Sequence, residues 1–488
     1  MRITKKATSN NVIPAKAGIK KFLKSLDSRL CECGKLIIIR GSQKRIWLGI
    51  AILFPIIVGI PIVVQAAVED ILSHFQVYVT AQEEYNSNID LRPNRFKRDD
   101  FITTISPGIR FSTTPKSPVT GEFRQTPTAE ERYGVDLDFR AGFVFYAKEH
   151  DDNYISLNGT LNGWYTFTRN LTFRVRDYLI RSDEIRETDL SASALPGQTL
   201  LARTNRREPY YRNVFEPSLE YRFGRENLVA VNYRNSIYRI KSRTAEDSTE
   251  NYFNPRVAYW FNVRHGVSFE YGLSLGDFQR SPDLVGHMAM GRYTYRFNPR
   301  TSVFGEYTYL TRDFESPSIG YDVHRPSLGI DHAFSPTLSG RGQAGHFWQN
   351  PERGSTTRGF FYDASLSKRG DKTTYALSFQ GGYTEVYFAA ENLGFIKNHR
   401  VTGSITHQLL QRMSVGLYSS YEWAKYPGTE IGFRTPVDQI WGVGGNASYQ
   451  ILRWLNLSLD LSHRENRSNI SDRDYSEYRG MLRATATY

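Results

Sequence analysis

The chain has 488 residues, of which 40% are hydrophobic, 14% aromatic and 23% charged, with a mean hydropathy of −0.48. So many aromatic residues at a polar average exclude a disordered chain and a bundle of membrane helices. The net charge is +12, yet residues 1–66 hold 12 Lys and Arg against 2 Asp and Glu, which leaves 50 against 48 for residues 67–488. The basic balance therefore belongs to the N-terminus, and we expect no nucleic-acid partner.

The N-terminus has the pattern of an export signal. Lys44-Arg45 precede an uncharged apolar run from Ile46 to Val64, and Val64-Gln65-Ala66 is a small-residue cleavage pattern. This order predicts a signal peptide within residues 1–66. The run is also long enough to span a bilayer, so an uncleaved inner-membrane anchor is the alternative. The stretch before it is unusually long for a signal peptide, which suggests a mis-assigned start for residues 1–35.

Residues 67–488 are dominated by strict alternation of apolar and polar side chains, which is the signal of β-strands. Examples are Val267 to Leu275, Tyr375 to Tyr383 and Leu455 to Leu461. Most of these runs are longer than a typical strand of a soluble protein. Very short connections, such as Phe334 to Leu338, alternate along the chain with longer polar ones, such as Tyr426 to Pro436.

Short turns at one end and longer loops at the other are typical of outer-membrane barrels. The sequence therefore predicts an all-β fold, a transmembrane antiparallel up-and-down outer-membrane β-barrel of about 20 strands (18–22) over residues 67–488, with both termini in the periplasm. A soluble β-propeller or two-sheet sandwich is the alternative. The strands are expected to begin near Phe75, Phe101, Tyr133, Tyr154, Leu171, Asn213, Leu228, Tyr252, Val267, Val285, Ser302, Val323, Leu338, Arg358, Thr374, Arg400, Ser414, Gln439, Leu455 and Tyr475.

The two faces of each strand can be assigned from energy. An Arg or Lys that faces lipid at mid-membrane costs roughly 2–4 kcal/mol, whereas a charge in the lumen is solvated. The rows of Leu, Val and Tyr, including Tyr375 to Tyr383, should therefore face lipid. The predicted lumen-lining residues are Arg110, Arg140, Arg234, Arg256, Arg292, Arg341, Glu270, Glu306, Asp331 and Asp460.

Two interpretations of these lumen charges are open. Rings of charged side chains select ions in channels, whereas opposite charges on neighbouring strands also stabilise a sheet as cross-strand pairs. The near balance of signs favours cross-strand pairs. Phe347, Tyr418 and Trp260 form either a sugar-stacking track or packing contacts. The long connection from Ser182 to Arg212 either folds inward or stays a solvated loop.

The last segment of the chain alternates up to a terminal aromatic residue. Tyr478, Gly480, Leu482 and Tyr488 share one face. Such an ending resembles the signal that the outer-membrane barrel assembly machinery recognises, so this machinery and outer-membrane lipid are expected partners.

Two short motifs near the start of the barrel carry a resemblance. They are Glu84-Tyr85-Asn86-Ser87-Asn88-Ile89 and Ser106-Pro107-Gly108. Together with the Tyr-rich hairpins and Tyr488, they make residues 75–488 similar to the putative β-barrel porin 2 family. The resemblance implies an outer-membrane barrel, often encoded with exopolysaccharide or capsule genes, and implies no catalytic residues.

The expected function is a polar-lined channel of the bacterial outer membrane, for porin-like diffusion or polysaccharide export, with polysaccharide or export-complex proteins as further candidate partners. A plugged structural or surface barrel is the main alternative, and a barrel enzyme is a weaker one. No H-E-x-x-H, G-x-S-x-G or P-loop motif occurs. Both cysteines, Cys31 and Cys33, precede residue 67. We therefore expect no catalytic residues, no metal and no cofactor.

Overall fold

The computed structural model describes residues 74–113, 132–184, 187–188, 199–200, 207–241, 245–316, 318–388, 394–427 and 434–488. The predicted signal peptide, its apolar run and both cysteines lie outside these residues. In the described part of the chain, helical backbone is limited to three 3-10 segments of three residues each. None of them has the length or apolarity to cross a membrane.

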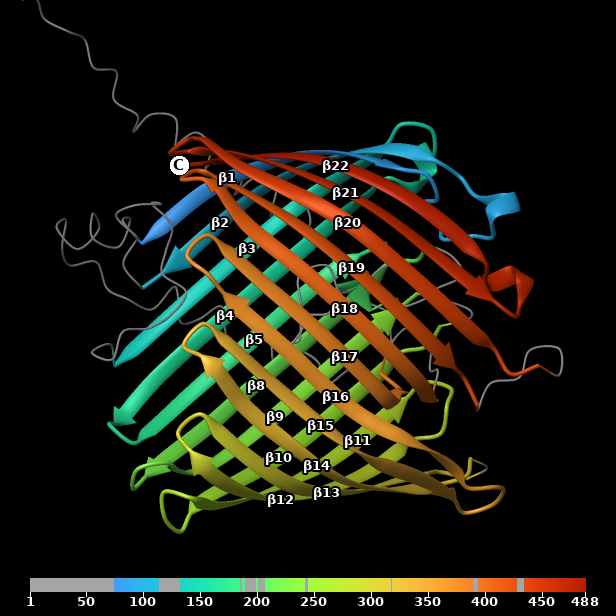
Figure 1. Cartoon of the computed structure of the whole chain (residues 1–488). Coiled ribbons are helices and arrows are strands. Elements are labelled where there is room, and N and C mark those ends of the chain that lie inside the picture. The colour runs from blue at the N-terminus through green and yellow to red at the C-terminus, as the bar shows by residue number, and fades with distance from the viewer. Residues whose placement is uncertain are drawn as a thin grey trace, which may run out of the picture. The chain divides into compact units, whose positions relative to one another are not determined.

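Twenty antiparallel strands form one sheet, and β1 pairs with β22 to close it (Figure 1). This confirms the predicted 20-stranded barrel. Strands β6 and β7 form a separate two-stranded sheet within the β5–β8 connection. The strands are β1 (Phe75–Asn86), β2 (Asp100–Ser112), β3 (Tyr133–Tyr146), β4 (Tyr154–Thr168), β5 (Leu171–Ser182), β6 (Glu187–Thr188), β7 (Thr199–Leu200), β8 (Tyr210–Phe223), β9 (Asn227–Ile240), β10 (Ser248–Trp260), β11 (His265–Phe278), β12 (Leu284–Asn298), β13 (Thr301–Phe314), β14 (Tyr321–Ser335), β15 (Leu338–Pro351), β16 (Thr357–Arg369), β17 (Thr373–Val386), β18 (Gly394–Leu410), β19 (Met413–Lys425), β20 (Val437–Leu452), β21 (Leu455–Ser468) and β22 (Tyr475–Thr487).

The barrel has two different ends. At the terminal end, where β1 begins and β22 ends, the turns from β4–β5 onward are only two to four residues long, as in Arg169–Asn170 and Phe261–Arg264. At the loop end the connections are longer, up to the segment between Ser182 and Tyr210. One connection departs from the predicted rule, because β2 and β3 are joined at the terminal end by residues 113–132.

Four prolines lie inside barrel strands, at Pro107, Pro217, Pro255 and Pro326. A proline has no N–H, so it removes one hydrogen bond of the ladder. The pairing between β10 and β11 accordingly skips Pro255. The side chain of the preceding Asn254 compensates, since its Nδ2 donates to the Tyr271 carbonyl oxygen at 2.9 Å.

Candidate functional site: the lumen wall and its inward segment

Each strand presents one apolar and one polar face, because successive side chains point to opposite sides of the sheet. On β11, the side chains of Val267 and Phe269 are exposed on the outward face. Ser268 and Glu270 lie on the inward face between them. The same separation holds on β21, where Leu459 and Leu461 are exposed outward. The outward surface is therefore an apolar belt, and the inward surface carries the charges.

All ten predicted lumen-lining residues lie on the inward face, opposite the exposed apolar rows. Most of them contact a residue of opposite charge or an amide on a neighbouring strand. The contacts are Arg110 Nε to Asp138 Oδ2 at 2.8 Å, Arg234 Nη2 to Glu250 Oε2 at 2.8 Å, Arg292 Nε to Glu306 Oε2 at 2.9 Å, Arg341 Nε to Asp331 Oδ1 at 3.8 Å and Asn254 Nδ2 to Glu270 Oε1 at 3.0 Å.

Four of the ten residues form no ion pair within the described residues. They are Arg140, Arg256, Asp460 and Glu270, of which Glu270 accepts from the Asn254 amide. The Nε of Arg256 is buried and has no hydrogen-bond partner there either. The structure places the ten residues on the inward face and shows which of them have a partner of opposite charge, which the sequence could not say.

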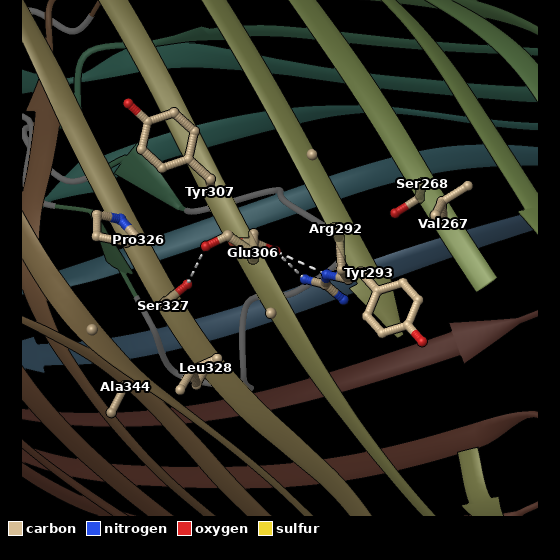
Figure 2. A pocket seen from close by; sticks show the side chains of 13 residues that line it. Val267, Ser268, Arg292, Tyr293, Glu306, Tyr307, Pro326, Ser327, Leu328 and Ala344 are labelled. Carbon is tan, nitrogen blue, oxygen red and sulfur yellow. Dashed lines mark hydrogen bonds and ion pairs between the residues drawn. The ribbon is translucent and has the colours of Figure 1, made fainter. Parts of the chain in front are cut away.

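Glu306 is the centre of the most extensive inward network (Figure 2). Its carboxylate accepts from Arg292 on β12 and from Gln343 Nε2 on β15, the latter at 3.0 Å, and lies 3.6 Å from Arg325 Nη2 on β14. The Glu306 side chain is only 3% exposed. The network ties four consecutive strands together, and sequence analysis missed the contributions of Arg325 and Gln343.

Further ion pairs of the same kind lie elsewhere around the wall. Arg400 Nη2 and Glu422 Oε2 are 2.7 Å apart between β18 and β19. Arg479 donates to Glu84 across the closing seam of β22 and β1, with both contacts at 2.7 Å. These partners could not be matched from the sequence, since a cross-strand pair is visible only when the register of the two strands is known.

The inward aromatic residues pack against glycines of the neighbouring strands. The ring of Trp260 lies over Gly266, and the ring of Tyr418 lies over Gly444, so that a Cβ at either glycine would overlap the ring. Phe347 covers Gly359 in the same manner and is only 1% exposed. Such aromatic cover of a glycine stabilises a sheet. This geometry favours the packing role over a sugar-stacking track for these rings.

The alternation breaks on β17, and one prediction is wrong there. Gly382 has a φ of +143°, which is a backbone conformation that other residues rarely adopt. The pairing of β16 with β17 ends just before it, at Tyr362 and Gly381. Beyond Gly382 the side chain of Tyr383 packs against Phe347 and Phe395 in a cluster of buried residues instead of facing lipid. The unusual backbone conformation of one glycine thus shifts the alternation, and the side chains that follow it on β17 point to the opposite face of the sheet.

We call residues 383–388 together with Phe395 the inward segment. Glu385 accepts from Arg312 Nη2 of β13 at 2.7 Å, and it is also hydrogen-bonded by the Tyr321 hydroxyl of β14. Tyr387 contacts the same hydroxyl at 2.6 Å. Phe388 stacks on Phe278 of β11, with ring centroids 5.3 Å apart.

These contacts show that the inward segment reaches from its own strands to β11, β13 and β14. Strands β17 and β18 are separated in sequence from β11 by five other strands of the wall. The segment therefore occupies part of the space enclosed by the barrel at the loop end. The flanking glycines, Gly382 and Gly394, both have positive φ, at +143° and +66°.

A second cluster lies at the loop end near β1 to β4. Ile89, in the β1–β2 connection, is fully buried with the inward residues Ile102, Val144 and Tyr146. Arg207 covers this cluster, since its Nη2 donates to the Ile89 carbonyl oxygen at 2.8 Å and its Nη1 to the Tyr146 hydroxyl. The end of the long connection after Ser182 is thus anchored over the barrel wall, while residues 189–198 and 201–206 lie outside the described residues.

Charge stabilises this second cluster. Arg207 Nε lies 3.4 Å from Asp90 Oδ1, and Arg207 Nη1 lies 3.9 Å from Glu184 Oε2. Burial by itself lowers the pKa of the Arg207 guanidinium, but the neighbouring carboxylates and tyrosines raise it overall above its usual value. The guanidinium therefore remains charged at any physiological pH.

A hollow of about 800 Å³ lies between Tyr293, Tyr307 and Leu328 (Figure 2), and Gly291 and Gly305 also line it. A Cβ at Gly291 would meet no atom within 4 Å. Most of the residues that line the hollow belong to the apolar outward face, and Arg292 and Glu306 of the wall also border it. Across the described residues, no group of three His, Cys, Asp or Glu side chains is arranged to hold a metal ion.

The assembly signal predicted at the C-terminus lies on the last strand. Tyr478 and Leu482 are exposed on the outward face of β22. The Tyr488 N–H donates to the Val77 carbonyl oxygen of β1 at 2.8 Å. Tyr259 and Trp454, which lie near the short turns, are exposed at the terminal end.

Comparisons with solved structures find barrels of low sequence identity. The siderophore receptor PirA from Pseudomonas aeruginosa is 9% identical with a TM-score of 0.46, over 85% of this chain and 80% of that chain. OccAB2 from Acinetobacter baumannii is 10% identical with a TM-score of 0.39, over 85% of this chain and 98% of that chain. No curated protein matches the sequence.

The family comparison gives a clearer result. Residues 279–488 match the model of the family described as "Putative beta-barrel porin 2". The expected resemblance extended over residues 75–488, so the motifs at Glu84–Ile89 and Ser106–Gly108 lie outside the match. The matched residues form β12 to β22, and these strands include the Glu306 network and the inward segment. Residues 279–488 thus match the putative beta-barrel porin 2 family, and the closed barrel that they help to form is a bacterial outer-membrane β-barrel.

Proposed function

We propose that the protein is a passive, porin-like channel for small polar solutes, with a lumen that the inward segment narrows at the loop end. The observation that carries the proposal is the contrast between the two faces of the wall. Arg–carboxylate pairs such as Arg110–Asp138 and Arg400–Glu422 line the inward face. Their charges need water or fixed partners, so they support a hydrated lumen.

The width of the barrel supports the same proposal. Barrels of 16–18 strands leave an aqueous channel, and 22-stranded transporters need a plug to fill the lumen. Twenty strands therefore enclose more space than the paired wall side chains can fill. The balanced pairs favour weak ion selectivity, because each cation of a pair is neutralised by a neighbouring carboxylate.

A second candidate function is a closed structural barrel. The observation that favours it is the packing of both loop-end clusters, in which Tyr321, Phe347 and Ile89 are almost completely buried. We also propose polysaccharide export as an alternative function. In that case a protein of an export complex would open a lumen that is closed in the isolated barrel. The proposed channel performs no chemical step, so we also propose that the protein is not an enzyme.

Single-channel conductance distinguishes these proposals. The protein is extracted from the outer membrane in detergent, checked for heat-modifiable mobility and inserted into a planar bilayer. We expect steady conductance steps with weak preference between K⁺ and Cl⁻. A heat-modifiable barrel that never conducts would contradict the porin-like proposal and favour the closed barrel.

Delivery to the membrane is part of the proposal. We propose that an N-terminal signal peptide directs export and that the assembly machinery recognises the terminal strand through Tyr478, Gly480, Leu482 and Tyr488. Replacing Tyr488 with Ala should lower the amount of heat-modifiable barrel in the outer membrane. An unchanged amount would contradict the proposed recognition.

A further inference from the structure

The outward face of β5 and β8–β10 carries one carboxylate and three amide side chains, whereas outward polar residues on other strands, such as His287 and His324, are hydrogen-bonded to tyrosines. Asp177, Asn213, Asn235 and Asn251 lie on four consecutive strands of the sheet and form what we call the polar stripe. Counted from the loop end, Asp177 and Asn235 are the sixth residues of their strands, and Asn213 and Asn251 are the fourth. Their outward neighbours Phe215 and Phe253 are exposed apolar residues, which places the polar stripe within the apolar belt.

The polar stripe consists of two hydrogen-bonded pairs, each between adjacent strands. Asn213 Nδ2 donates to Asp177 Oδ1 at 2.8 Å and to the Tyr178 carbonyl oxygen at 3.1 Å. Asn235 Nδ2 donates to Asn251 Oδ1 at 2.9 Å. Asn235 is paired directly with Asn251 in the register of β9 and β10 and with Phe215 in that of β8 and β9.

These bonds leave hydrogen-bonding groups unused. An asparagine amide offers two N–H donors and an oxygen acceptor. Within the described residues, the Asn213 and Asn235 amide oxygens accept no hydrogen bond and the Asn251 amide nitrogen donates none. Lipid tails offer neither donors nor acceptors, so leaving such groups against lipid costs free energy.

We propose that the polar stripe is the interface of a twofold dimer of this chain. Both copies must keep the same end in the periplasm, so the twofold axis runs along the membrane normal. Such an axis near Asn235 brings β10 of one copy opposite β8 of the other. Asn251 and Asn213 are both the fourth residue from the loop end of their strands, and their free nitrogen and free oxygen are complementary.

The chemistry favours a second copy over the other occupants of the membrane. A lipid headgroup lies at the surface of the bilayer, whereas the stripe lies beside the exposed apolar side chains of Phe215 and Phe253. A ring of three copies would place the stripe against a different outward patch. On β20, for example, the outward face presents Trp441 and Val443, which are exposed apolar side chains, and a single amide, Gln439.

Cross-linking in the native membrane tests the dimer. Full-length protein in which Cys31 and Cys33 are Ser receives one new cysteine, either Phe215→Cys beside the stripe or Val443→Cys on β20, and a short bismaleimide is added to intact outer membranes. We expect a cross-linked pair of this chain with Phe215→Cys and almost none with Val443→Cys. Equal cross-linking at both sites, none at Phe215→Cys, or a product containing a different protein would overturn the proposal.

The oligomeric mass gives an independent test in mild detergent. Light scattering should give a protein mass twice that of one chain for the unaltered protein and of one chain for Asn213→Leu/Asn251→Leu. Ser419→Leu, which removes an outward hydroxyl of β19, serves as the matched control and should remain a dimer. Heat-modifiable mobility shows that each variant is folded. If the cross-link at Phe215→Cys also persists in the double variant, or if the unaltered protein has the mass of one or three chains, the proposal is wrong.

Discussion

The wall around Glu306 and the wall around Gly382 begin with the same sequence pattern and end in different structures. Along β12 to β15, alternation continues without a change of face, and Arg292, Glu306 and Gln343 meet across adjacent strands. On β17, the alternation of side chains shifts at Gly382, and the Glu385 side chain reaches Arg312, 73 residues earlier in the chain, while its backbone stays paired with β18. The comparison shows that a regular wall is stabilised by neighbours in register, whereas the inward segment depends on contacts across the lumen.

The two regions should therefore respond differently to loss of a carboxylate. A carboxylate of the regular wall stabilises the barrel as a whole, because the strands that it ties together carry the sheet. A carboxylate of the inward segment stabilises only the position of that segment. Stability and conductance, measured on the same variants, separate the two roles.

The largest effect on stability is expected for Glu306→Ala. The substitution leaves Arg292 and Arg325 without their shared carboxylate, and breaking a buried ion pair costs about 3–5 kcal/mol. We expect the free energy of unfolding, measured by urea titration in detergent micelles, to fall by about that amount. Single-channel conductance should stay unchanged. A large change in conductance would contradict the prediction that the regular wall affects stability alone.

The largest effect on conductance is expected for Glu385→Ala. Its ion pair with Arg312 is buried on both sides, with side-chain exposures of 13% and 14%. Loss of the partner costs about 1–3 kcal/mol locally, and the inward segment should move away from β13. Conductance steps should become larger or noisier while the unfolding midpoint changes little. Steps identical to those of the unaltered protein would show that the segment does not restrict the lumen.

A smaller effect is expected for Gly382→Ala. At a φ of +143°, a residue with a Cβ is strained by roughly 1–2 kcal/mol, within the range for sparsely populated backbone conformations. We expect the variant to shift conductance in the same direction as Glu385→Ala. Gly305→Ala, an outward glycine whose Cβ would only touch Leu328 at 3.5 Å, is the matched control and should behave like the unaltered protein.

The smallest effect is expected for Tyr321→Phe. The ring remains in its cluster, but the hydroxyl contacts to Glu385 and Tyr387 are lost, which costs about 0.5–1.5 kcal/mol. Conductance noise at the loop end should rise slightly, and stability should stay within error. An effect larger than that of Glu385→Ala would mean that Tyr321, rather than the ion pair, holds the inward segment in place.

Much of the wall follows from sequence alone. Rows such as Leu455 to Leu461 predict both the strand and its outward face, because a side-chain period of two leaves a single way to separate apolar from polar residues. The short turns at the terminal end and the even number of strands follow from the same pattern. The sequence assigned the charges, including Arg292 and Glu306, to the inward face for this reason, and the structure places them there.

The alternation of apolar and polar residues predicted the wrong face where the backbone conformation departed from a regular strand. Tyr383 continues the apolar row in the sequence, and no residue type marks the shift except Gly382, one of 38 glycines in the chain. The polar stripe was missed as well, since Asp177 and Asn213 stand on different strands and share a face only when the registers are known.

The sequence by itself determined the architecture of this protein: the strands, their faces and the location of charge. Only the tertiary structure decided which charges meet, as with Arg479 and Glu84, which lie 395 residues apart at the closing seam. The physical reason is that the choice of face is a local property of alternation, whereas a partner depends on register, closure and the path of the loops.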